Sequence, residues 1–530
     1  MKSGISLILS SAYLSEELAV EFGKIPPSFL PIGLARLYEE QIKTFPSDEP
    51  IYLTIPENFI IPIYDKIKLE KLNVNIIPVS PDISIGESII CALTYIGKTN
   101  IVRILYGDTL IDDLPPYTDN VVAIYQDTTD YPWAFVESDE NNIISCIEVI
   151  KPGMIDNNRP AVCGFFSFSD SEILLKTIND NKGDFISSLN SLSKQRKLST
   201  LSVKKWHDFG HIQTYFDSRR RFTTERAFNT LSIDTITVRK SGLKRKILAE
   251  SDWYSSLPPT VQPYTTRFFE KGEINSYPYY TMEYNYAPTL SDLFVFSSVG
   301  RTTWQKIINS CQEFLSKCSE IHGPNQASKS LFSLVNKKTI DRLQLFSNMT
   351  GFDIDHQTKY NDRSLPSLLK IAEICCDMID LNKKNHETIM HGDFCFSNIL
   401  YNSRASRIIT IDPRGYTDQG PNSIFGDNRY DLAKLAHSTF GYYDMILAGR
   451  YNLDQNNFSY LIDFDINSDH LWIQDAFSEI NVLGMSAKSQ NVTAIMITLF
   501  LSMLPLHNDR PDRQRAFIAN ALRLFYIFQS

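Results

Sequence analysis

The first 220 residues alternate short apolar segments with stretches of helical periodicity. The apolar segments predict strands at residues 5–9, 51–55, 74–78, 102–106 and 162–168. Helical stretches lie between them, for example at residues 34–43 and 87–95. Strands that alternate with helices predict a mostly parallel sheet with helices on its faces. Because ligands bind at the carboxyl ends of such strands, the segments that follow them are the first place to look for a site.

The pattern changes at residues 217–226, where the polar and basic stretch DSRRRFTTER marks a domain boundary. The chain is strand-rich from residue 228 to about residue 286, and mostly helical from residue 290 onward. One loop-and-strand interruption lies at residues 388–415. We therefore expect an α/β domain, a small sheet-containing lobe and a helical lobe, which cover residues 1–222, 223–288 and 289–530.

The composition excludes several classes of protein. Of the 530 residues, 43% are hydrophobic and 21% are charged, values that argue against disorder, collagen and coiled coil. Lysine and arginine number 52 against 61 aspartate and glutamate, so the net charge is −9. An acidic total gives no general attraction to nucleic acid or to an anionic membrane. A local basic pocket for a nucleotide remains compatible with it.

The eight cysteines contain no CxxC pair, which argues against both a disulfide framework and a zinc site and suits a reducing cytosol. The N-terminal apolar run is too short for a signal peptide. The longest apolar stretch, residues 492–506, is interrupted by polar residues and by Pro505, so it predicts a buried helix. We expect a cytoplasmic protein without membrane insertion.

The strongest candidate for chemistry is the segment HGDFCFSN at residues 391–398, which a strand at residues 407–411 follows. Phosphoryl transfer needs a carboxylate near the attacking hydroxyl and oxygen ligands that hold Mg²⁺ on the phosphates. Asp393 suits the first role. Asn398 and Asp412 suit the second, because Mg²⁺ prefers carboxylate and amide oxygens together with phosphate and water. The plainer alternative is that HGD is a turn and Asn398 a helix cap.

This segment resembles the catalytic loop of the aminoglycoside phosphotransferase and choline kinase-like family, in which HGDxxxxN precedes a strand that carries a metal-binding aspartate. Residues 426–433 (GDNRYDLA) resemble the helix that follows in that family, and Asp427 and Asp431 are expected to be structural supports. The resemblance implies a bilobal, protein-kinase-like α+β fold. It also implies ATP and Mg²⁺, a small-molecule hydroxyl acceptor and Asp393 as the catalytic residue.

In the small lobe, residues 235–240 (TITVRK) predict a strand, and a helix is expected at residues 245–254. By the same resemblance, Lys240 would contact the α- and β-phosphates of ATP, and Glu250 would pair with it. Lys244 and Lys246 are rivals for that role. A lysine at a strand end is also commonly just a solvated charge.

The segment Met282-Glu283-Tyr284 resembles the kinase hinge, which hydrogen-bonds adenine through its backbone. Glu283 and Tyr284 are therefore candidate nucleotide-binding residues, and an ordinary strand end is the alternative. No Gly-rich loop precedes this segment, which leaves the phosphate contacts less defined than the catalytic loop.

Two separated stretches of the first domain carry a second candidate site. Residues 101–112 (IVRILYGDTLID) form an apolar segment that ends in Gly107-Asp108, and residues 204–216 (KKWHDFGHIQTYF) place Asp208 before a glycine. Glycine lets the backbone approach a ligand, and an aspartate at the carboxyl end of a strand can hold a divalent metal. His207 and His211 are interpreted as packing or surface residues, because no cysteine or third histidine lies at ligand spacing.

These stretches resemble nucleotidyltransferases of the sugar-phosphate and phosphocholine type, which join a phosphorylated small molecule to a nucleotide. The resemblance implies a Rossmann-like α/β domain in which Asp108 and Asp208 hold one Mg²⁺. Metal and Lys or Arg must neutralise the charge before an anionic phosphate can attack an anionic NTP.

The opening loop departs from that family. Residues 10–15 (SSAYLS) contain neither glycine nor arginine, and Pro27 stands where the family has a lysine, with Lys24 three residues earlier. A Gly-rich loop presents backbone N–H groups to phosphates. Either Lys24 and a rebuilt loop bind the nucleotide, or the domain binds or scaffolds without transferring.

Together the resemblances imply a bifunctional enzyme. The kinase would phosphorylate a small hydroxyl compound, and the first domain would couple that phosphate to a nucleotide from a second NTP and release pyrophosphate. Such activated precursors suit bacterial surface polysaccharides such as capsule. The acceptor is an amino alcohol, a polyol or a sugar, and analogy favours an amino alcohol with CTP.

Two other functions stay open. One is a kinase whose first domain is a catalytically silent nucleotide-binding or scaffold module. The other is an interaction scaffold in which both sites have decayed, against which the presence of Asp393, Asn398 and Asp412 argues. The sequence leaves the oligomeric state open.

Overall fold

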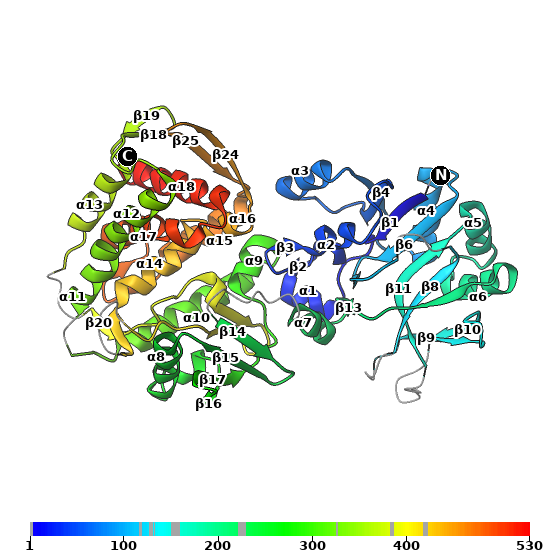
Figure 1. The fold of residues 1–530 in the computed structure, drawn as a ribbon, viewed down its shortest axis with the longest axis horizontal. Coiled ribbons are helices and arrows are strands. Elements are labelled where there is room, and N and C mark those ends of the chain that lie inside the picture. Colours follow the sequence, from blue (N-terminus) through cyan, green and yellow to red (C-terminus); the bar gives the residue numbers. More distant parts are fainter. Residues whose placement is uncertain are drawn as a thin grey trace. The chain divides into compact units, whose positions relative to one another are not determined.

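The structure, a computed structural model, describes residues 4–115, 119–126, 131, 133–149, 159–220, 229–324, 327–381, 386–416 and 422–529. The chain divides into two compact units, Met1–Thr223 with Phe296–Ser298, and Thr224–Val295 with Val299–Ser530. The boundary expected at residues 222/223 lies outside the described residues. Figure 1 follows the chain from blue at the N-terminus to red at the C-terminus.

One sheet organises the first unit. Its strands among the described residues are β1 (Gly4–Leu9), β4 (Ile51–Pro56), β5 (Val74–Val79), β6 (Ile101–Tyr106), β8 (Val121–Tyr125), β9 (Ala134–Ser138), β10 (Ile144–Val149), β11 (Ala161–Phe168) and β12 (Ser199–Ser202). The order β6-β1-β4-β5 is parallel throughout. On the other side of β6 the sheet continues through β11, which runs antiparallel to β6, β8 and β9. All five predicted strands are confirmed.

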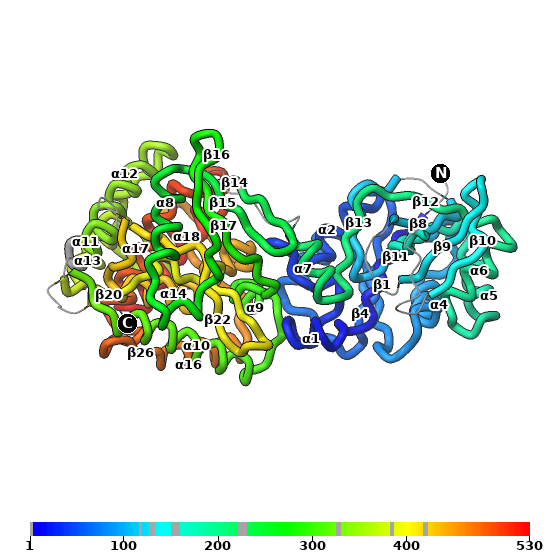
Figure 2. The backbone as a smooth tube through the Cα atoms, turned by 90° about the horizontal axis from the view of Figure 1, so that it is seen from below, coloured from blue at the N-terminus to red at the C-terminus, as the bar shows by residue number. Residues whose placement is uncertain are grey.

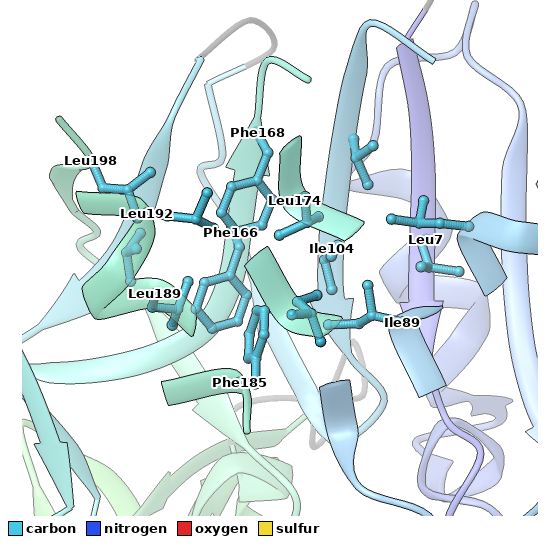
Figure 3. Close-up of a cluster of buried hydrophobic side chains, with 14 of the residues drawn as sticks. Leu7, Ile89, Ile104, Phe166, Phe168, Leu174, Phe185, Leu189, Leu192 and Leu198 are labelled. Carbon is cyan, nitrogen blue, oxygen red and sulfur yellow. The ribbon is translucent and has the colours of Figure 1, made fainter. Parts of the chain in front are cut away.

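Helices cover one face of this sheet and bury its apolar side chains (Figure 3). They are α4 (Ile85–Ile96), α5 (Ser171–Asp180) and α6 (Phe185–Arg196). Phe166 on β11 meets Phe185 on α6 edge to face, with ring centroids 5.1 Å apart. Each buried side chain of this size contributes about 1.5–3 kcal/mol. This core fixes the strands whose carboxyl ends carry the candidate site.

The remaining elements of this unit surround those strand ends. They are α1 (Glu16–Phe22), β2 (Pro31–Ile32), β3 (Ala35–Arg36), α2 (Leu37–Lys43), α3 (Ile63–Lys71), β7 (Thr109–Ile111), β13 (Trp206–Asp208) and α7 (Ile212–Arg220). The helix predicted at residues 34–43 is thus found as α2, three residues shorter at its N-terminus.

The second unit begins with an antiparallel sheet in the order β14-β15-β17-β16. Its strands are β14 (Asn229–Ile233), β15 (Thr237–Gly242), β16 (Phe268–Ile274) and β17 (Tyr277–Glu283). Helix α8 (Lys244–Ser255) lies beside this sheet in Figure 2. The predicted strand and helix are both present, the strand displaced by two residues toward the C-terminus.

Helices dominate the rest of the chain. They are α9 (Leu290–Phe296), α10 (Arg301–Ser319), α11 (Ala327–Phe332), α12 (Lys338–Thr350), α13 (Leu368–Asp377), α14 (Asn428–Thr439), α15 (Tyr443–Leu447), α16 (Ser468–Ser478), α17 (Gln490–Met503) and α18 (Pro511–Gln529). Short strand pairs are β20 (Glu387–Ile389) with β23 (Phe425–Asp427), β21 (Ile399–Asn402) with β22 (Arg407–Thr410), and β26 (Asn481–Val482) with β27 (Met485–Ser486).

Within the described residues, one helical stretch, Gln490–His507, is long and apolar enough to cross a membrane, and 61% of it is buried inside the protein. Helix α17 makes up most of this stretch. Its side chains from Val492 to Ser502 are almost all buried. The prediction of a buried helix in this region is confirmed.

A further sheet was missed by the expectation that the chain is mostly helical after residue 290. Its order among the described strands is β19-β18-β25-β24, from β19 (Arg363–Leu365), β18 (Thr358–Tyr360), β25 (Ser459–Phe464) and β24 (Tyr451–Asn456). In β25 the buried residues Tyr460 and Ile462 alternate with exposed ones, which is the period of a strand. Asn457 adopts a positive φ of 50° in the connecting turn, a conformation that Asn tolerates.

Candidate active sites

The loop at residues 391–398 is held by helix α14. The backbone N–H groups of His391 and Gly392 donate to the two carboxylate oxygens of Asp431, each at 2.7 Å. Gly392 has φ of +78°, and a Cβ there would lie 2.7 Å from Cβ of Arg414, so the turn requires glycine. Burial raises the pKa of Asp431 to about 7, although the two N–H groups favour its charged form. Asp431 therefore anchors the backbone of the loop.

The side chain of Asp393 lies at the centre of the loop, and 34% of it is exposed. Its Oδ2 accepts a hydrogen bond from Nδ2 of Asn398 at 2.9 Å, and the same amide donates to the carbonyl oxygen of Asp393 at 3.0 Å. Oδ1 forms an ion pair with Nζ of Lys434 at 2.9 Å. The carboxylate is thus held from two sides while it stays accessible.

Asn398 is the last residue of a short 3₁₀ turn, Phe396–Asn398, whose N-cap is Cys395. Asn398 is therefore not a helix cap, which removes that part of the alternative. Because its NH₂ group points to Asp393, its Oδ1 is the atom oriented to serve as a metal ligand.

Asp412 is brought beside Asn398 by the β21–β22 hairpin. Ile399 pairs with Thr410 in the register of the hairpin, and Ile411 N–H donates to the carbonyl of Asn398 at 3.0 Å. Asp412 has a positive φ of 56°, uncommon for a residue other than glycine, and its N–H donates to the hydroxyl oxygen of Tyr254 at 3.2 Å. The hairpin thus presents one amide oxygen and one carboxylate at the same end.

Lys240 on β15 joins these groups to the small sheet. Its Nζ lies 2.9 Å from Oε2 of Glu250 on α8 and 2.8 Å from Oδ1 of Asp412. Burial alone lowers the pKa of Lys240, but the two carboxylates outweigh it and the pKa is raised. The hydroxyl of Tyr280 donates to Glu250 at 2.8 Å. The structure therefore unites residues that are up to 172 positions apart in one partly buried network.

The rival lysines do not occupy this position. Lys246 lies 3.7 Å from Oε1 of Glu250 and is 36% exposed, and Lys244 is exposed. Lys246 therefore lies at the rim of the network, whereas the side chain of Lys240 is 2% exposed.

At Glu283 and Tyr284 the backbone N–H groups are already bonded within the protein. Glu283 N–H donates to the carbonyl of Arg267 at 2.9 Å, and Tyr284 N–H donates to the carbonyl of Ile236 at 2.7 Å. The carbonyl of Glu283 accepts from the hydroxyl of Thr266 at 2.9 Å. The same carbonyl also accepts from Nδ2 of Asn285 at 3.2 Å. Neither residue can donate an N–H to adenine in this arrangement, so the group considered for a nucleotide contact is the carbonyl oxygen of Tyr284.

The sequence analysis missed Lys434. A signal was nevertheless present, because Lys434 lies three residues after Asp431 on one helix, and such residues are neighbours on the helix surface. Once Asp431 holds the backbone of His391 and Gly392, Lys434 faces the next residue of the loop.

In the first unit, the two short strands β7 and β13 bring Asp108 and Asp208 together. Their antiparallel register pairs Asp208 with Thr109, the residue next to Asp108. A Cβ placed on Gly210 would lie 2.6 Å from Oδ2 of Asp108 and 3.5 Å from Oδ1 of Asp208. Both carboxylates therefore border the same space, which stays open because residue 210 is a glycine without a Cβ.

The surroundings of this acidic pair disfavour the charged forms of both carboxylates. Burial raises the pKa of Asp108, and burial together with the negative charge of Asp108 raises the pKa of Asp208 to about 8. The N–H of Gly210, at 3.3 Å, and the hydroxyl of Thr214 donate to Oδ2 of Asp208 and offset part of this cost. Two neighbouring carboxylates whose charged forms are disfavoured in this way form a site that favours a cation.

The donor set fits Mg²⁺. No group of three or more His, Cys, Asp or Glu among the described residues could hold a metal without further ligands. Mg²⁺ is commonly bound by one or two carboxylates together with substrate phosphates and water. Asp108 with Asp208, and Asn398 with Asp412, both supply that kind of set.

Lys24 is exposed, and its Nζ lies over the ring of Tyr13, 4.4 Å from the ring centroid. In the described part of the chain no ion pair joins Lys24 to Asp108 or Asp208. The loop after β1 is held by side chains instead of glycines. Ser10 donates its N–H to Oγ1 of Thr54 at 2.9 Å, and the hydroxyl of Tyr13 donates to Oδ1 of Asn58 at 2.5 Å.

An aromatic cluster, which the sequence analysis also missed, lies beside the acidic pair. Trp133 meets Trp206 edge to face at 5.0 Å, and Tyr131 stacks on His211 at 5.0 Å. The pKa of Tyr131 is raised by burial and then by the charge of Asp208. The cluster is therefore close enough to the acidic pair for the charge of Asp208 to raise the pKa of Tyr131.

The histidines agree with a packing role. Nε2 of His207 lies 3.4 Å from Oδ2 of Asp112, and His211 belongs to the aromatic cluster. Neither forms a metal-binding group with other described residues.

Searches of known protein families and of curated proteins find no match to this sequence. Solved structures similar to the chain include CTP:phosphocholine cytidylyltransferase from Streptococcus pneumoniae, with 14% identity, 42% of this chain and 100% of that chain covered, and a TM-score of 0.34. The inositol-1-phosphate CTP transferase of T. maritima matches with 12% identity, 43% and 100% coverage, and a TM-score of 0.33.

A thermostable mutant of an aminoglycoside phosphotransferase also matches, with 12% identity, 57% of this chain and 93% of that chain covered, and a TM-score of 0.34. Similar structures thus include both kinds of enzyme that the motifs resemble. At these identities and TM-scores the likeness alone establishes no activity, and the functional argument rests on the site geometry.

Proposed function

We propose that the chain is a bifunctional enzyme, a small-molecule kinase joined to a nucleotidyltransferase. The observation that carries the proposal is the network around Lys240. It links Glu250 and Asp412 by contacts of 2.9 and 2.8 Å, at a hairpin whose other arm holds Asn398 against Asp393. A phosphate-binding lysine, two oxygen ligands and an accessible carboxylate are the parts that phosphoryl transfer requires.

In the kinase step, the acceptor hydroxyl oxygen forms a bond to the γ-phosphorus of ATP. The bond from that phosphorus to the β,γ-bridging oxygen breaks, ADP leaves, and the hydroxyl proton passes to Asp393. Lys240 binds the α- and β-phosphates, with Glu250 orienting its ammonium. Tyr284 contributes its carbonyl oxygen to the adenine amino group.

In the second step, a phosphate oxygen of the new phosphomonoester attacks the α-phosphorus of a second NTP. The bond between this phosphorus and the α,β-bridging oxygen breaks, and pyrophosphate leaves. Mg²⁺, when bound, neutralises phosphate charge as a Lewis acid in both sites. Asn398 and Asp412 would hold it in the kinase, and Asp108 with Asp208 in the transferase.

The aromatic cluster favours an amino alcohol over a polyol or a sugar as the group that is activated. Tyr131, Trp133 and Trp206 present aromatic rings beside an acidic pair, and aromatic faces attract organic ammonium groups. CTP is the favoured second nucleotide, because the named activities of two similar structures use CTP. Activated amino alcohols of this kind suit surface polysaccharide synthesis in the cytoplasm, which is the biological context proposed here.

A second candidate function is a kinase whose first unit is catalytically silent. Two observations favour it: Lys24 stacks on Tyr13, and no lysine or arginine of the described chain is ion-paired with Asp108 or Asp208. In a silent first unit, no lysine or arginine would add to the positive charge that transfer requires at the phosphates.

The two candidates are separated by single variants of the full-length chain. With ATP, CTP and a set of amino alcohols, Asp393→Ala should lower ADP formation by about 10²–10⁴-fold. Asp108→Ala should abolish pyrophosphate release and spare ADP formation. Asp355→Ala and Asp180→Ala replace exposed aspartates outside both sites and serve as matched controls. ADP formation without pyrophosphate in the wild type supports the silent first unit, and normal turnover of Asp393→Ala refutes the kinase assignment.

A further inference from the structure

We propose that Lys434 is a positioning residue of the kinase step, which fixes the orientation of the Asp393 carboxylate. This inference rests on the proposed kinase function. Nζ of Lys434 lies 2.9 Å from Oδ1 of Asp393, and the side chain of Lys434 is 13% exposed. Burial alone lowers the pKa of Lys434, but the charge of Asp393 outweighs it and the pKa is raised, so the lysine stays charged.

Helix α14 contacts the loop at three successive points. Asp431 binds the N–H groups of residues 391 and 392, Lys434 binds the side chain of Asp393, and Ser438 Oγ accepts the N–H of Phe396 at 3.0 Å. Residues spaced by three and four positions lie on one face of a helix. Asp431 and Ser438 thus fix the backbone of the loop, and Lys434 fixes its reactive side chain.

The two oxygens of Asp393 have different partners. Oδ2 accepts from the neutral amide of Asn398, whereas Oδ1 binds an ammonium. A charge-assisted hydrogen bond is about twice as strong as a neutral one. The ammonium therefore contributes more than the amide to holding the carboxylate in one rotamer.

Other charged or titratable groups around this pair do not replace Lys434. Arg414 donates to the hydroxyl of Tyr430 at 3.1 Å. His437 is fully buried between Tyr443 and Phe500, at centroid distances of 4.4 and 4.1 Å, and burial holds its pKa well below the usual value. Other groups that face the pair are Asp431, Cys395 and His391.

A carboxylate that carries an ammonium on one oxygen is a weak base. This suits phosphoryl transfer, whose loose transition state depends on positioning and charge stabilisation more than on base strength. Asp393 then acts by accepting the hydrogen bond of the acceptor hydroxyl and aiming its oxygen at the γ-phosphorus. Without Lys434 the carboxylate can rotate, and the line of attack is lost.

The test is a double-mutant cycle on the full-length chain, read as ADP formation at saturating acceptor. Lys434→Met should lower kcat about tenfold to a hundredfold, as expected for lost alignment, with KM for ATP changed by less than about twofold. Lys434→Arg should recover most of the loss because it keeps the charge. In an Asp393→Asn background, Lys434→Met should change kcat by less than about threefold, since residues that act as a unit are not additive.

Lys370→Met is the matched control, because Lys370 forms an ion pair of the same length, 2.9 Å, with Glu373 on the exposed surface of α13. Lys434→Gln, which keeps a polar group but loses the charge, is measured in parallel, so that a folding defect of the methionine variant does not decide the outcome. The same loss of kcat is expected for it.

The positioning role is overturned by an unchanged kcat in Lys434→Gln, by an equal loss in both Asp393 backgrounds, or by a change in KM for ATP alone. A wild-type chain that forms no ADP with any acceptor overturns the kinase function itself and the role of Lys434 with it. The two failures are therefore distinguishable.

Discussion

Replacing Asp108 by asparagine should stabilise the metal-free first unit and abolish the response of that unit to Mg²⁺. The pKa of Asp208 is raised to about 8 by burial and by the charge of Asp108. A raised carboxyl pKa means that the folded state binds the proton more tightly than the unfolded chain does. The free energy of unfolding therefore falls as the pH rises from about 4, the unfolded value, to about 8.

The magnitude follows from this shift. Four pKa units correspond to at most about 5 kcal/mol. Because both carboxylates are half-buried and the value belongs to a coupled pair, about 1–2 kcal/mol is a realistic share for removing the Asp108 charge. In a unit of this size, 1 kcal/mol corresponds to about 2–4 °C in Tm. Asp108→Asn should therefore raise the Tm of the first unit at pH 8.5 in EDTA by about 2–8 °C.

The affinity for Mg²⁺ should also depend on pH, and it should increase as the pH rises. With a pKa of about 8 for Asp208, only about one molecule in ten carries both charges at pH 7. The apparent affinity of the wild type for Mg²⁺ should therefore rise about tenfold between pH 6 and pH 7 and level off above pH 8.

Thermal unfolding with and without Mg²⁺, at pH 6 and pH 8.5, measures both effects. Mg²⁺ should raise the Tm of the first unit of the wild type more at pH 8.5 than at pH 6, and should leave the Tm of that unit nearly unchanged in Asp108→Asn. A lower Tm for Asp108→Asn in EDTA at pH 8.5, or an equal response of both proteins to Mg²⁺, would refute the proposed cation site. Asp180→Asn, an exposed position in the same unit, is the control.

Three further predictions concern the two sites. Asp393→Ala should lower kcat for ADP formation by about 10²–10⁴-fold and should also lower the Tm of the second unit, because the largely buried ammonium of Lys434 loses its carboxylate; steady-state kinetics and thermal unfolding would check both. Lys240→Met should raise KM for ATP and also lower the Tm of the second unit, because it leaves Glu250 buried and less well paired at a cost of about 3–5 kcal/mol; an unchanged Tm would contradict the buried ion pair. Trp133→Ala should raise KM for a phosphorylated amino alcohol about tenfold while KM for CTP stays constant, since a cation–π contact is worth about 1–2 kcal/mol; an equal rise in both constants would argue against an ammonium subsite.

Much of the fold followed from local patterns in the sequence. The apolar segments of the first domain are strands because each is short and lies between helical periods, and the structure places all five in one sheet. The sheet after residue 290 was missed because its strands are short and mostly polar, as in the segment YNLDQN of β24. Such strands depend on pairing with distant partners, which local periodicity does not reveal.

The candidate loop at residues 391–398 and its proposed metal ligands could be singled out from sequence because these groups lie close together between residues 391 and 412. The partners that hold these groups could not be identified from the sequence. Lys434 contacts Asp393 from helix α14, and Lys240 contacts Asp412 although it lies 172 residues earlier in the chain. The aromatic cluster beside Asp208 likewise forms only when Tyr131 and Trp133 meet residues of β13 and the turn after it.

The hinge shows how backbone bonding limits an inference from sequence. Glu283 and Tyr284 lie at the end of a strand, as expected. Their N–H groups, however, donate to the carbonyl oxygens of Arg267 and Ile236. Whether a backbone amide is free depends on strand register, and no side-chain pattern encodes it directly.

The most direct test of the bifunctional assignment follows one phosphoryl group through both sites. The full-length chain is incubated with CTP, an amino alcohol and ATP labelled with ¹⁸O in its γ-phosphate, and the products are separated by mass spectrometry. The account predicts a nucleotide-linked amino alcohol that carries the label in the phosphate next to the alcohol, together with unlabelled pyrophosphate. A labelled phosphomonoester with no nucleotide-linked product would contradict the bifunctional assignment.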